Sequence, residues 1–296
     1  MGLWDSILSL ISPAAPPSII TPPPPPAPEV VTSQPVVASS DGTLLATCLA
    51  VSGAFENGGG ASYDTVSGNF DGNGLSIGIL QWNAGEGTLQ QLLVQISQSM
   101  TWVTMQTFFK SSIQQLATSN PHDGIQFCLD HYIEAGTTKV DPAALALWQT
   151  FLTQPDSIAA QKALAQQTVL SHAKRLVTQY TPSYVNRVRP YAFFFDVCTQ
   201  EGGMAVGHTV VPPVTSIPDI SDVMAFAQAH DPKCASLWQT AVQGDSLAQV
   251  LLHYGYARAM LAFPQYQWDT CSRRGTIACR QGIVHETSVD LTSKVD

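Results

Sequence analysis

The sequence is poor in charged residues. Asp, Glu, Lys and Arg make up 12% of its 296 residues, whereas hydrophobic residues make up 45%. The 13 basic side chains form no cluster, and the formal net charge is −9. Nucleic acid is therefore excluded as the main partner, because binding to phosphates depends on clustered Lys and Arg. A chain of this length and composition can bury a sizeable core.

Several common catalytic and metal-binding motifs are also missing. The six cysteines have no CxxC spacing, the seven histidines form no metal-binding pair, and no GxSxG sequence anchors a serine nucleophile. The turn sequence DGNG lacks the closing Glu of a calcium loop. We therefore predict neither a metal nor a cofactor. Cys48 is expected to be a buried thiol, whereas Cys271 and Cys279 could form a disulfide in an oxidising compartment.

The first 38 residues differ in composition from the rest. Residues 1–12 place Leu and Ile at helical spacing, which predicts a short amphipathic helix that docks on the protein or a partner. This segment is shorter than the roughly 20 residues that span a bilayer and lacks the basic start of an ordinary secretory signal. Residues 13–38 are proline-rich and should form an extended spacer. We expect a folded domain over 39–286 and a flexible tail over 287–296.

Helical patterns dominate the expected domain, with one short strand region near its start. The fold class predicted is mainly α (α+β), with two helical lobes and a small β-hairpin sheet beside a cleft. A strand is expected at Leu75–Trp82, and a loop rich in Gly and Pro at Gly202–Pro218. The expected helices are Thr43–Phe55, one or two over Thr88–Ala117, His122–Ile133, one after Asp141-Pro142, Asp156–Tyr180, Asn186–Thr199, Asp219–His230, Lys233–Val242 and Ser246–Phe263.

Two carboxylates stand in different surroundings near the start of this domain. Glu56 follows the apolar helix predicted over Thr43–Phe55, and Asp71 lies in a polar turn, NFDGNG. Cleavage of a glycosidic bond needs one protonated and one ionised carboxyl group, and a buried and a solvated acid meet that need. Taken singly, either residue has a simpler interpretation, as a solvated helix end or a turn former.

The stretch around these acids resembles the catalytic segment of the family 46 chitosanases, which belong to the lysozyme superfamily. The matching pieces are Glu56-Asn57, DGNGLS at Asp71–Ser76 and GILQWNAGEGTL at Gly78–Leu89. The resemblance implies a lysozyme-like fold, with Glu56 as general acid and Asp71 as general base. It also implies that Ser76 helps to hold the attacking water and that the anomeric carbon is inverted.

Three further segments extend the resemblance. YAFFFDV (Tyr191–Val197), YARAML (Tyr256–Leu261) and the SRR sequence before Gly275 are similar to segments that form a buried ion network behind the acid. The resemblance assigns Asp196, Arg258 and Arg273 to this supporting network. The alternative for each residue is an ordinary ion pair.

Two departures from the chitosanase pattern bear on the identity of the substrate. Thr88 replaces an Asp that grips a substrate amine in these chitosanases, and Leu75 replaces an aromatic residue. The LQW sequence of the expected strand is similar to that of bacterial and phage enzymes that degrade peptidoglycan. We therefore predict a muramidase-like peptidoglycan hydrolase, with a chitosanase and an inactive wall-binding module as alternatives. Trp82 either stacks on a sugar or packs in the core. The predicted substrate-binding residues are Asn57, Tyr63, Gln81, Trp82, Asn83 and Thr88.

The expected partner is a polysaccharide, and we expect a monomer. Residues 1–38 are the candidate contact for secretion machinery, a chaperone or an immunity protein. Without an ordinary signal peptide, the protein would be made in the cytoplasm and act in the periplasm or outside the cell. Delivery as an antibacterial effector, or release by lysis as for a lysin, would bring it there.

Overall fold

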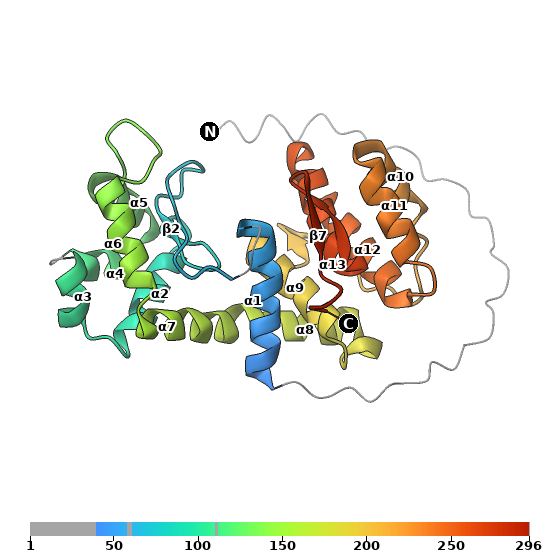
Figure 1. Cartoon of the computed structure of the whole chain (residues 1–296), viewed down its shortest axis with the longest axis horizontal. Coiled ribbons are helices and arrows are strands. Elements are labelled where there is room, and N and C mark those ends of the chain that lie inside the picture. The colour runs from blue at the N-terminus through green and yellow to red at the C-terminus, as the bar shows by residue number, and fades with distance from the viewer. Residues whose placement is uncertain (1–39, 58–60, 110–111, 296) are drawn as a thin grey trace. The chain divides into compact units, whose positions relative to one another are not determined.

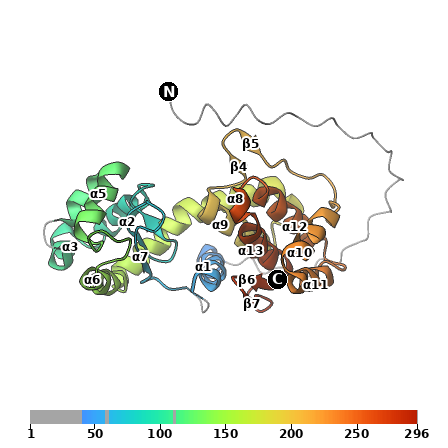
Figure 2. The same ribbon diagram turned by 90° about the horizontal axis from the view of Figure 1, so that it is seen from above.

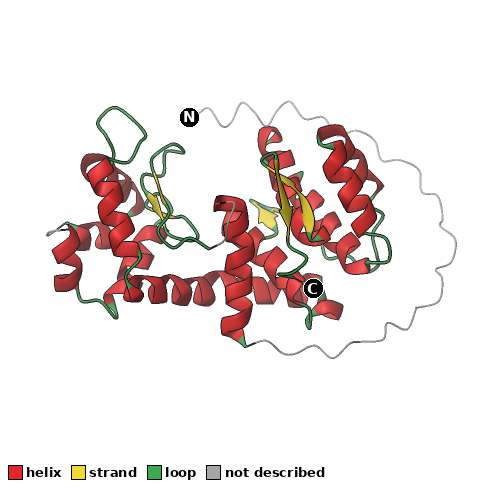
Figure 3. Cartoon of the chain, viewed as in Figure 1, coloured by secondary structure: helices red, strands yellow, loops and turns green. Residues whose placement is uncertain are grey.

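The structure is a computed structural model that describes residues 40–57, 61–109 and 112–295, without the side chains of Glu56 and Asn57. The predicted docking helix of residues 1–12 and the spacer of residues 13–38 lie outside the described residues. In the described part, helices dominate and the strands are short and antiparallel (Figure 3). The prediction of a mainly α fold with a small sheet is confirmed.

The first helix is buried on most of its surface. Helix α1 (Asp41–Asn57) contains the predicted helix Thr43–Phe55, and Leu45, Cys48, Leu49 and Val51 lie in the core. A helix that is apolar on nearly every face must be covered by other elements. Helix α1 packs against α9 (Val188–Glu201), which covers part of this apolar surface.

A first group of helices packs around the sheet (Figure 1). An aromatic cluster forms its centre, where the rings of Phe109 and Trp148 lie 4.4 Å apart. Prolines start three of its helices, and Asn120 and Asp141 cap two of them by accepting backbone N–H groups. The group comprises α2 (Thr88–Ser97), α3 (Trp102–Phe109), α4 (Ile113–Thr118), α5 (Pro121–His131), α6 (Pro142–Leu152) and α7 (Pro155–Ala165).

The sheet of this group has three two-residue strands. β1 (Val66–Ser67), β2 (Ser76–Ile77) and β3 (Trp82–Asn83) pair in this order, with Ser76 opposite Asn83. The single strand expected over Leu75–Trp82 is wrong, because the chain turns between β2 and β3. Gly78 has a φ of 75° there, and a Cβ on it would lie 2.4 Å from Oε1 of Gln161.

One continuous helical stretch leads from the first group to the second (Figure 2). The helix expected over Asp156–Tyr180 is present as α7, a π-helical turn at Gln166–Leu170 and α8 (Ser171–Tyr180). A π-helical turn widens the helix locally and often marks a functional position. Here its residues Thr168 and Val169 line a cavity described below.

The second group contains the remaining helices and packs around α13. Gly202, in the left-handed conformation with a φ of 71°, ends α9. The loop predicted at Gly202–Pro218 contains a small hairpin of β4 (Ala205–Val206) and β5 (Thr209–Val210). The group comprises α8, α9, α10 (Ser221–His230), α11 (Pro232–Ala241), α12 (Ser246–Ala259) and α13 (Gln267–Cys279), with short 3-10 turns at Pro182–Tyr184 and Pro264–Tyr266.

The end of the chain is not the flexible tail expected over 287–296. β6 (Gln281–Val284) pairs with β7 (Thr287–Asp290) in a hairpin, and Leu291 and Val295 are buried after it. The hairpin packs against α13. The burial of two apolar side chains holds this segment, which sequence pattern alone had not indicated.

The disulfide considered between Cys271 and Cys279 does not form, and all six cysteines are free thiols. Both residues lie on α13, two turns apart. A helix rises 1.5 Å per residue, so their Cα atoms are separated by about 12 Å. That distance exceeds the reach of a disulfide, which is about 7 Å between Cα atoms. Cys48 is buried, as expected.

The contact between α13 and α11 requires a glycine. A Cβ on Gly275 would lie 2.1 Å from the buried ring of Trp238. We expect Gly275→Ala to lower the free energy of unfolding by about 1–3 kcal/mol, because the ring must shift inside a packed core. Urea denaturation measures this change. Gly42→Ala in the first turn of α1 is the control. A Cβ at this position would lie 4.0 Å from the nearest atom, Oγ of Ser40, so the free energy of unfolding should not fall.

Candidate active site

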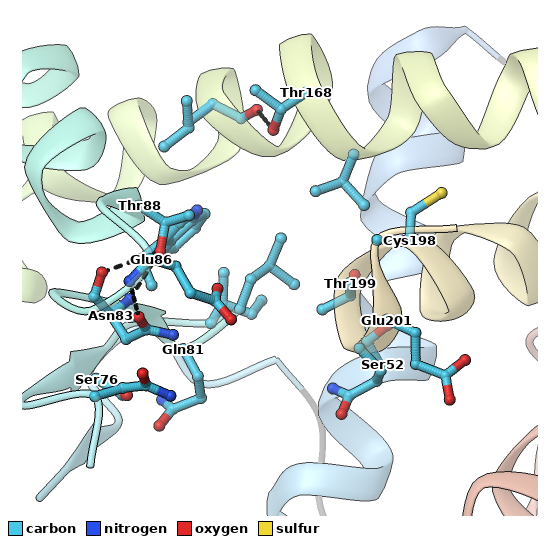
Figure 4. A pocket seen from close by; sticks show the side chains of 18 of the residues that line it. Ser52, Ser76, Gln81, Asn83, Glu86, Thr88, Thr168, Cys198, Thr199 and Glu201 are labelled. Carbon is cyan, nitrogen blue, oxygen red and sulfur yellow. Dashed lines mark hydrogen bonds between the residues drawn. The ribbon is translucent and has the colours of Figure 1, made fainter. Parts of the chain in front are cut away.

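A cavity of about 890 Å³ opens between the two groups of helices, and residues from both line it. The sheet and its turns contribute one side, whereas the end of α9 contributes the other (Figure 4). The π-helical turn adds Thr168 and Val169, and α1 adds Ser52. Cavities of this size accommodate several sugar rings or a drug-sized ligand.

Asp71 lies on the cavity wall, at an exposed turn before β2. Its two carboxylate oxygens accept hydrogen bonds from the backbone N–H and the side-chain amide of Asn73, both at 3.0 Å. Gly72 and Gly74, with φ angles of 83° and 82°, form the tight turn that brings these groups together. The two hydrogen bonds therefore hold the carboxylate in one orientation.

Glu56 lies near the end of α1, and its side chain, like that of Asn57, lies outside the described part of the structure. The helix places position 56 one turn after Ser52, which lines the cavity. The neighbouring ring of Phe55 packs under the guanidinium of Arg273, at 4.8 Å, and Arg273 also lines the cavity. This end of α1 is thus anchored at the cavity wall.

Ser76, Asn83 and Thr88 line the cavity, and Asn83 and Thr88 belong to one hydrogen-bonded turn. Thr88 Oγ1 accepts the backbone N–H of Asn83 and donates to its carbonyl oxygen, while Asn83 Oδ1 accepts the N–H of Glu86. Ser76, buried on β2, lies opposite Asn83. These interactions fix the wall opposite α9, visible in Figure 4.

The two aromatic residues predicted to bind substrate lie in different settings. Trp82 borders the cavity but is only 6% exposed, so most of its ring packs in the core. The ring of Tyr63 lies 5.4 Å from Nζ of Lys162, away from the described cavity lining. Gln81, next to Trp82, lines the cavity in the left-handed conformation, with a φ of 54°.

Sequence reasoning missed Phe70, which lines the cavity beside Asp71 and is 74% exposed. An exposed aromatic ring at a cavity mouth can stack on the apolar face of a sugar. The NFDGNG turn placed Phe70 next to the acid, but only the fold decides that this ring faces solvent while Trp82 is buried.

A buried ion network lies behind the cavity. Arg273 Nε donates to Asp196 Oδ1 at 2.8 Å, and the Asp196 side chain is fully buried. Arg258 does not pair with Asp196 in the described contacts; its Nε lies 3.3 Å from Glu201 Oε2 and donates to the carbonyl of Gly203. The predicted trio of Asp196, Arg258 and Arg273 is therefore joined through further residues.

Two of these further residues were missed. Glu201 ends α9 and lines the cavity, and Arg274 Nη2 lies 3.3 Å from its carboxylate and 3.7 Å from that of Asp196. Arg274 follows Arg273 in the SRR sequence, so the motif contained it. The sequence around Glu201 gave no sign that it belongs to the network, because its partners, Arg258 and Arg274, come from α12 and α13.

The cavity also holds a thiol and an imidazole, and burial shifts the pKa of each. Burial raises the pKa of the Cys198 thiol to about 12, so it remains protonated at neutral pH. Burial, followed by the nearby charge of Arg175, lowers the pKa of His172, which disfavours the charged form that a general acid needs at neutral pH. Among the described residues, no group of three or more His, Cys, Asp or Glu is placed to hold a metal ion.

Comparison with known proteins gives a similarity of fold. No family profile and no curated protein matches the sequence. Among solved structures, the chain is similar to a chitosanase complex, with a TM-score of 0.49 and 16% sequence identity. The alignment covers 83% of this chain and 95% of the chitosanase chain.

No helix in the described ranges has the length and apolar character needed to cross a membrane.

The buried network should be essential for stability. Asp196→Asn would leave Arg273 and Arg274 facing a neutral amide inside the protein, and we expect a loss of about 3–5 kcal/mol in the free energy of unfolding. Chemical denaturation followed by circular dichroism measures it. Lys174→Gln, which removes the exposed ion pair with Asp41, should cost less than about 1 kcal/mol. Equal losses for the two variants would contradict this account.

Proposed function

We propose that this protein is a glycoside hydrolase that cleaves β-1,4 bonds of an amino-sugar polymer, with peptidoglycan as its substrate. One observation carries the proposal: Asp71 and Ser52 both line the cavity of about 890 Å³. Ser52 lies on α1, one helical turn before Glu56. Two carboxylates across a sugar-sized space are what this chemistry requires.

In the proposed reaction, Glu56 is the general acid and Asp71 the general base. Glu56 donates its proton to the glycosidic oxygen as the bond from that oxygen to the anomeric carbon breaks. Asp71 takes a proton from a water molecule that attacks the same carbon from the opposite face, which inverts its configuration. Ser76, in the wall near Asp71, supplies a hydroxyl that can orient the water.

The rest of the cavity lining supports a saccharide ligand. Uncharged amides and hydroxyls from both sides line it, and these groups suit the hydroxyl and acetamido groups of amino sugars. Phe70 offers an exposed ring at the mouth. Such a surface combines stacking with hydrogen bonds, as binding of a neutral polar ring requires. The uncharged lining residues include Ser52, Asn73, Gln81, Asn83, Thr88, Gln91, Thr168 and Thr199.

One observation favours chitosan as the second candidate substrate. Glu86 is an exposed acid in the lining, and Asp71 adds another, so the cavity could attract a polycation. Against this, Thr88 stands where the chitosanases carry an amine-binding Asp, and its hydroxyl is engaged with the backbone of Asn83. We therefore rank peptidoglycan first.

Replacing either acid should stop catalysis without unfolding the protein. Proton transfer by a positioned group contributes about 10²–10⁴-fold, so we expect Glu56→Gln to lower kcat roughly 1000-fold or more and Asp71→Asn roughly 100-fold. Release of reducing ends from purified sacculi measures kcat, and thermal unfolding reports folding. The control is Glu286→Gln, an exposed acid in the β6–β7 turn, which should keep the parental rate. Parental turnover by Glu56→Gln would remove the assignment.

Product analysis tests the substrate. Mass spectrometry of digested sacculi should detect saccharides with hydrolysed reducing ends and no 1,6-anhydro sugar, because water is the attacking group. Activity on chitosan alone would establish the second candidate. Zero turnover by both the parent and Glu56→Gln, with both still binding sacculi, would establish a wall-binding module instead.

A further inference from the structure

A second cavity, of about 570 Å³, adjoins the first and has no part in the proposed reaction. Gln200, Glu201 and Arg273 line both cavities, so they form a shared wall. The other lining residues come from the hairpin after α9, the end of α12, the 3-10 turn at Pro264–Tyr266 and the first turns of α13. A chain bound in the first cavity therefore lies next to the second.

The rim of the second cavity is apolar and exposed. Phe263 is 67% exposed and Tyr266 57%, and Leu261, Ala262 and Pro264 line the cavity beside them. Large aromatic side chains in solvent, gathered around a hollow, typically mark a binding surface. Tyr266 lies in the short 3-10 turn that Pro264 starts, and Phe263 directly precedes that turn.

Arg258 forms part of the floor. The residue is only 4% exposed, and its Nε is bound to the Gly203 carbonyl at 2.9 Å and to Glu201 at 3.3 Å. No described residue accepts a hydrogen bond from its terminal nitrogens Nη1 and Nη2. A held guanidinium with two parallel N–H donors matches a carboxylate in geometry and charge.

The two acids of the cavity already have partners, so neither points an unpaired carboxylate at a ligand. Glu201 lies against Arg258 and Arg274, and Asp269 lies 2.6 Å from Nε2 of His285. Arg273 and Arg274 also line the cavity. Their guanidinium groups are already engaged with Asp196 and Glu201. Arg258 is therefore the donor of the floor that an anion would meet, and the rim presents aromatic and aliphatic groups.

We propose that the second cavity binds an acidic peptide, with Arg258 holding a carboxylate and Phe263 and Tyr266 packing against apolar side chains. The identity of the natural occupant rests on the proposed function: peptidoglycan carries short acidic peptides on its glycan, and the shared wall places such a branch beside the cleaved strand. Chitosan has no such branch, so the second cavity would give preference for peptide-bearing glycan.

Isothermal titration of the full chain with the synthetic peptide acetyl-Ala-Glu-Ala tests this inference. We expect saturable binding by the parent, and at least a ten-fold higher Kd for Phe263→Ser/Tyr266→Ser. The matched control is Val103→Ser on α3, another side chain that is 74% exposed, which should bind within two-fold of the parent. The same peptide with both carboxylates amidated should bind at least ten-fold more weakly, because Arg258 loses its anion.

Arg258→Gln adds a direct test of the carboxylate contact and should also raise the Kd at least ten-fold. Should this buried variant fail to fold by circular dichroism, the aromatic variant and the amidated peptide still decide the matter. Absence of saturable binding by the parent, or an unchanged Kd in the aromatic variant, would overturn the inference. Displacement of the peptide by a neutral N-acetylglucosamine oligomer would identify a sugar subsite instead. Since titration needs no hydrolysis, its failure is distinguishable from inactivity on sacculi.

Discussion

The fully buried carboxylate of Asp196, held between Arg273 and Arg274, is the constraint on which the site depends. Removing such charges from water costs several kcal/mol per ion, and the opposite charges of Arg273 and Arg274 offset that cost. It fastens α9 to α13, and Glu201 extends it to Arg258 on α12. Because Arg273 also lies on the Phe55 ring, the same network reaches the end of α1, where Glu56 follows.

Local signals predicted most of the helices. The Asn120-Pro121 and Asp141-Pro142 pairs mark helix starts through a cap and a fixed φ, and the structure has helices at both. The β6–β7 hairpin was missed because its stability comes from packing on α13 and from burying Leu291 and Val295. The strand expected at Leu75–Trp82 failed because the Gly78 turn is fixed by Gln161, a residue distant in sequence.

Local sequence predicted the backbone setting of some candidate residues. The glycines around Asp71 predicted its turn, and the apolar pattern predicted the helix that contains Asp196. The other features of the site depend on tertiary contacts. Glu201 joins the network only because the fold places it beside Arg258 and Arg274. Likewise, only the packing of the sheet leaves Phe70 exposed and Trp82 buried. Sequence pattern cannot distinguish these two aromatic residues, since both lie in the same Gly-rich stretch.

The state of the cavity's other reactive groups favours chemistry by carboxylates. A thiol whose pKa is raised to about 12 by burial is a poor nucleophile, and a histidine whose pKa is lowered cannot serve as a charged acid at neutral pH. The carboxylate of Glu201 is paired with the guanidinium groups of Arg258 and Arg274, and these ion pairs join α9 to α12 and α13. Asp71, by contrast, has only neutral amide partners and is exposed, so the general base proposed above would break no ion pair when it acts. The two sides of the cavity therefore differ: the α9 side carries paired charges, and the sheet side carries a carboxylate that forms no ion pair.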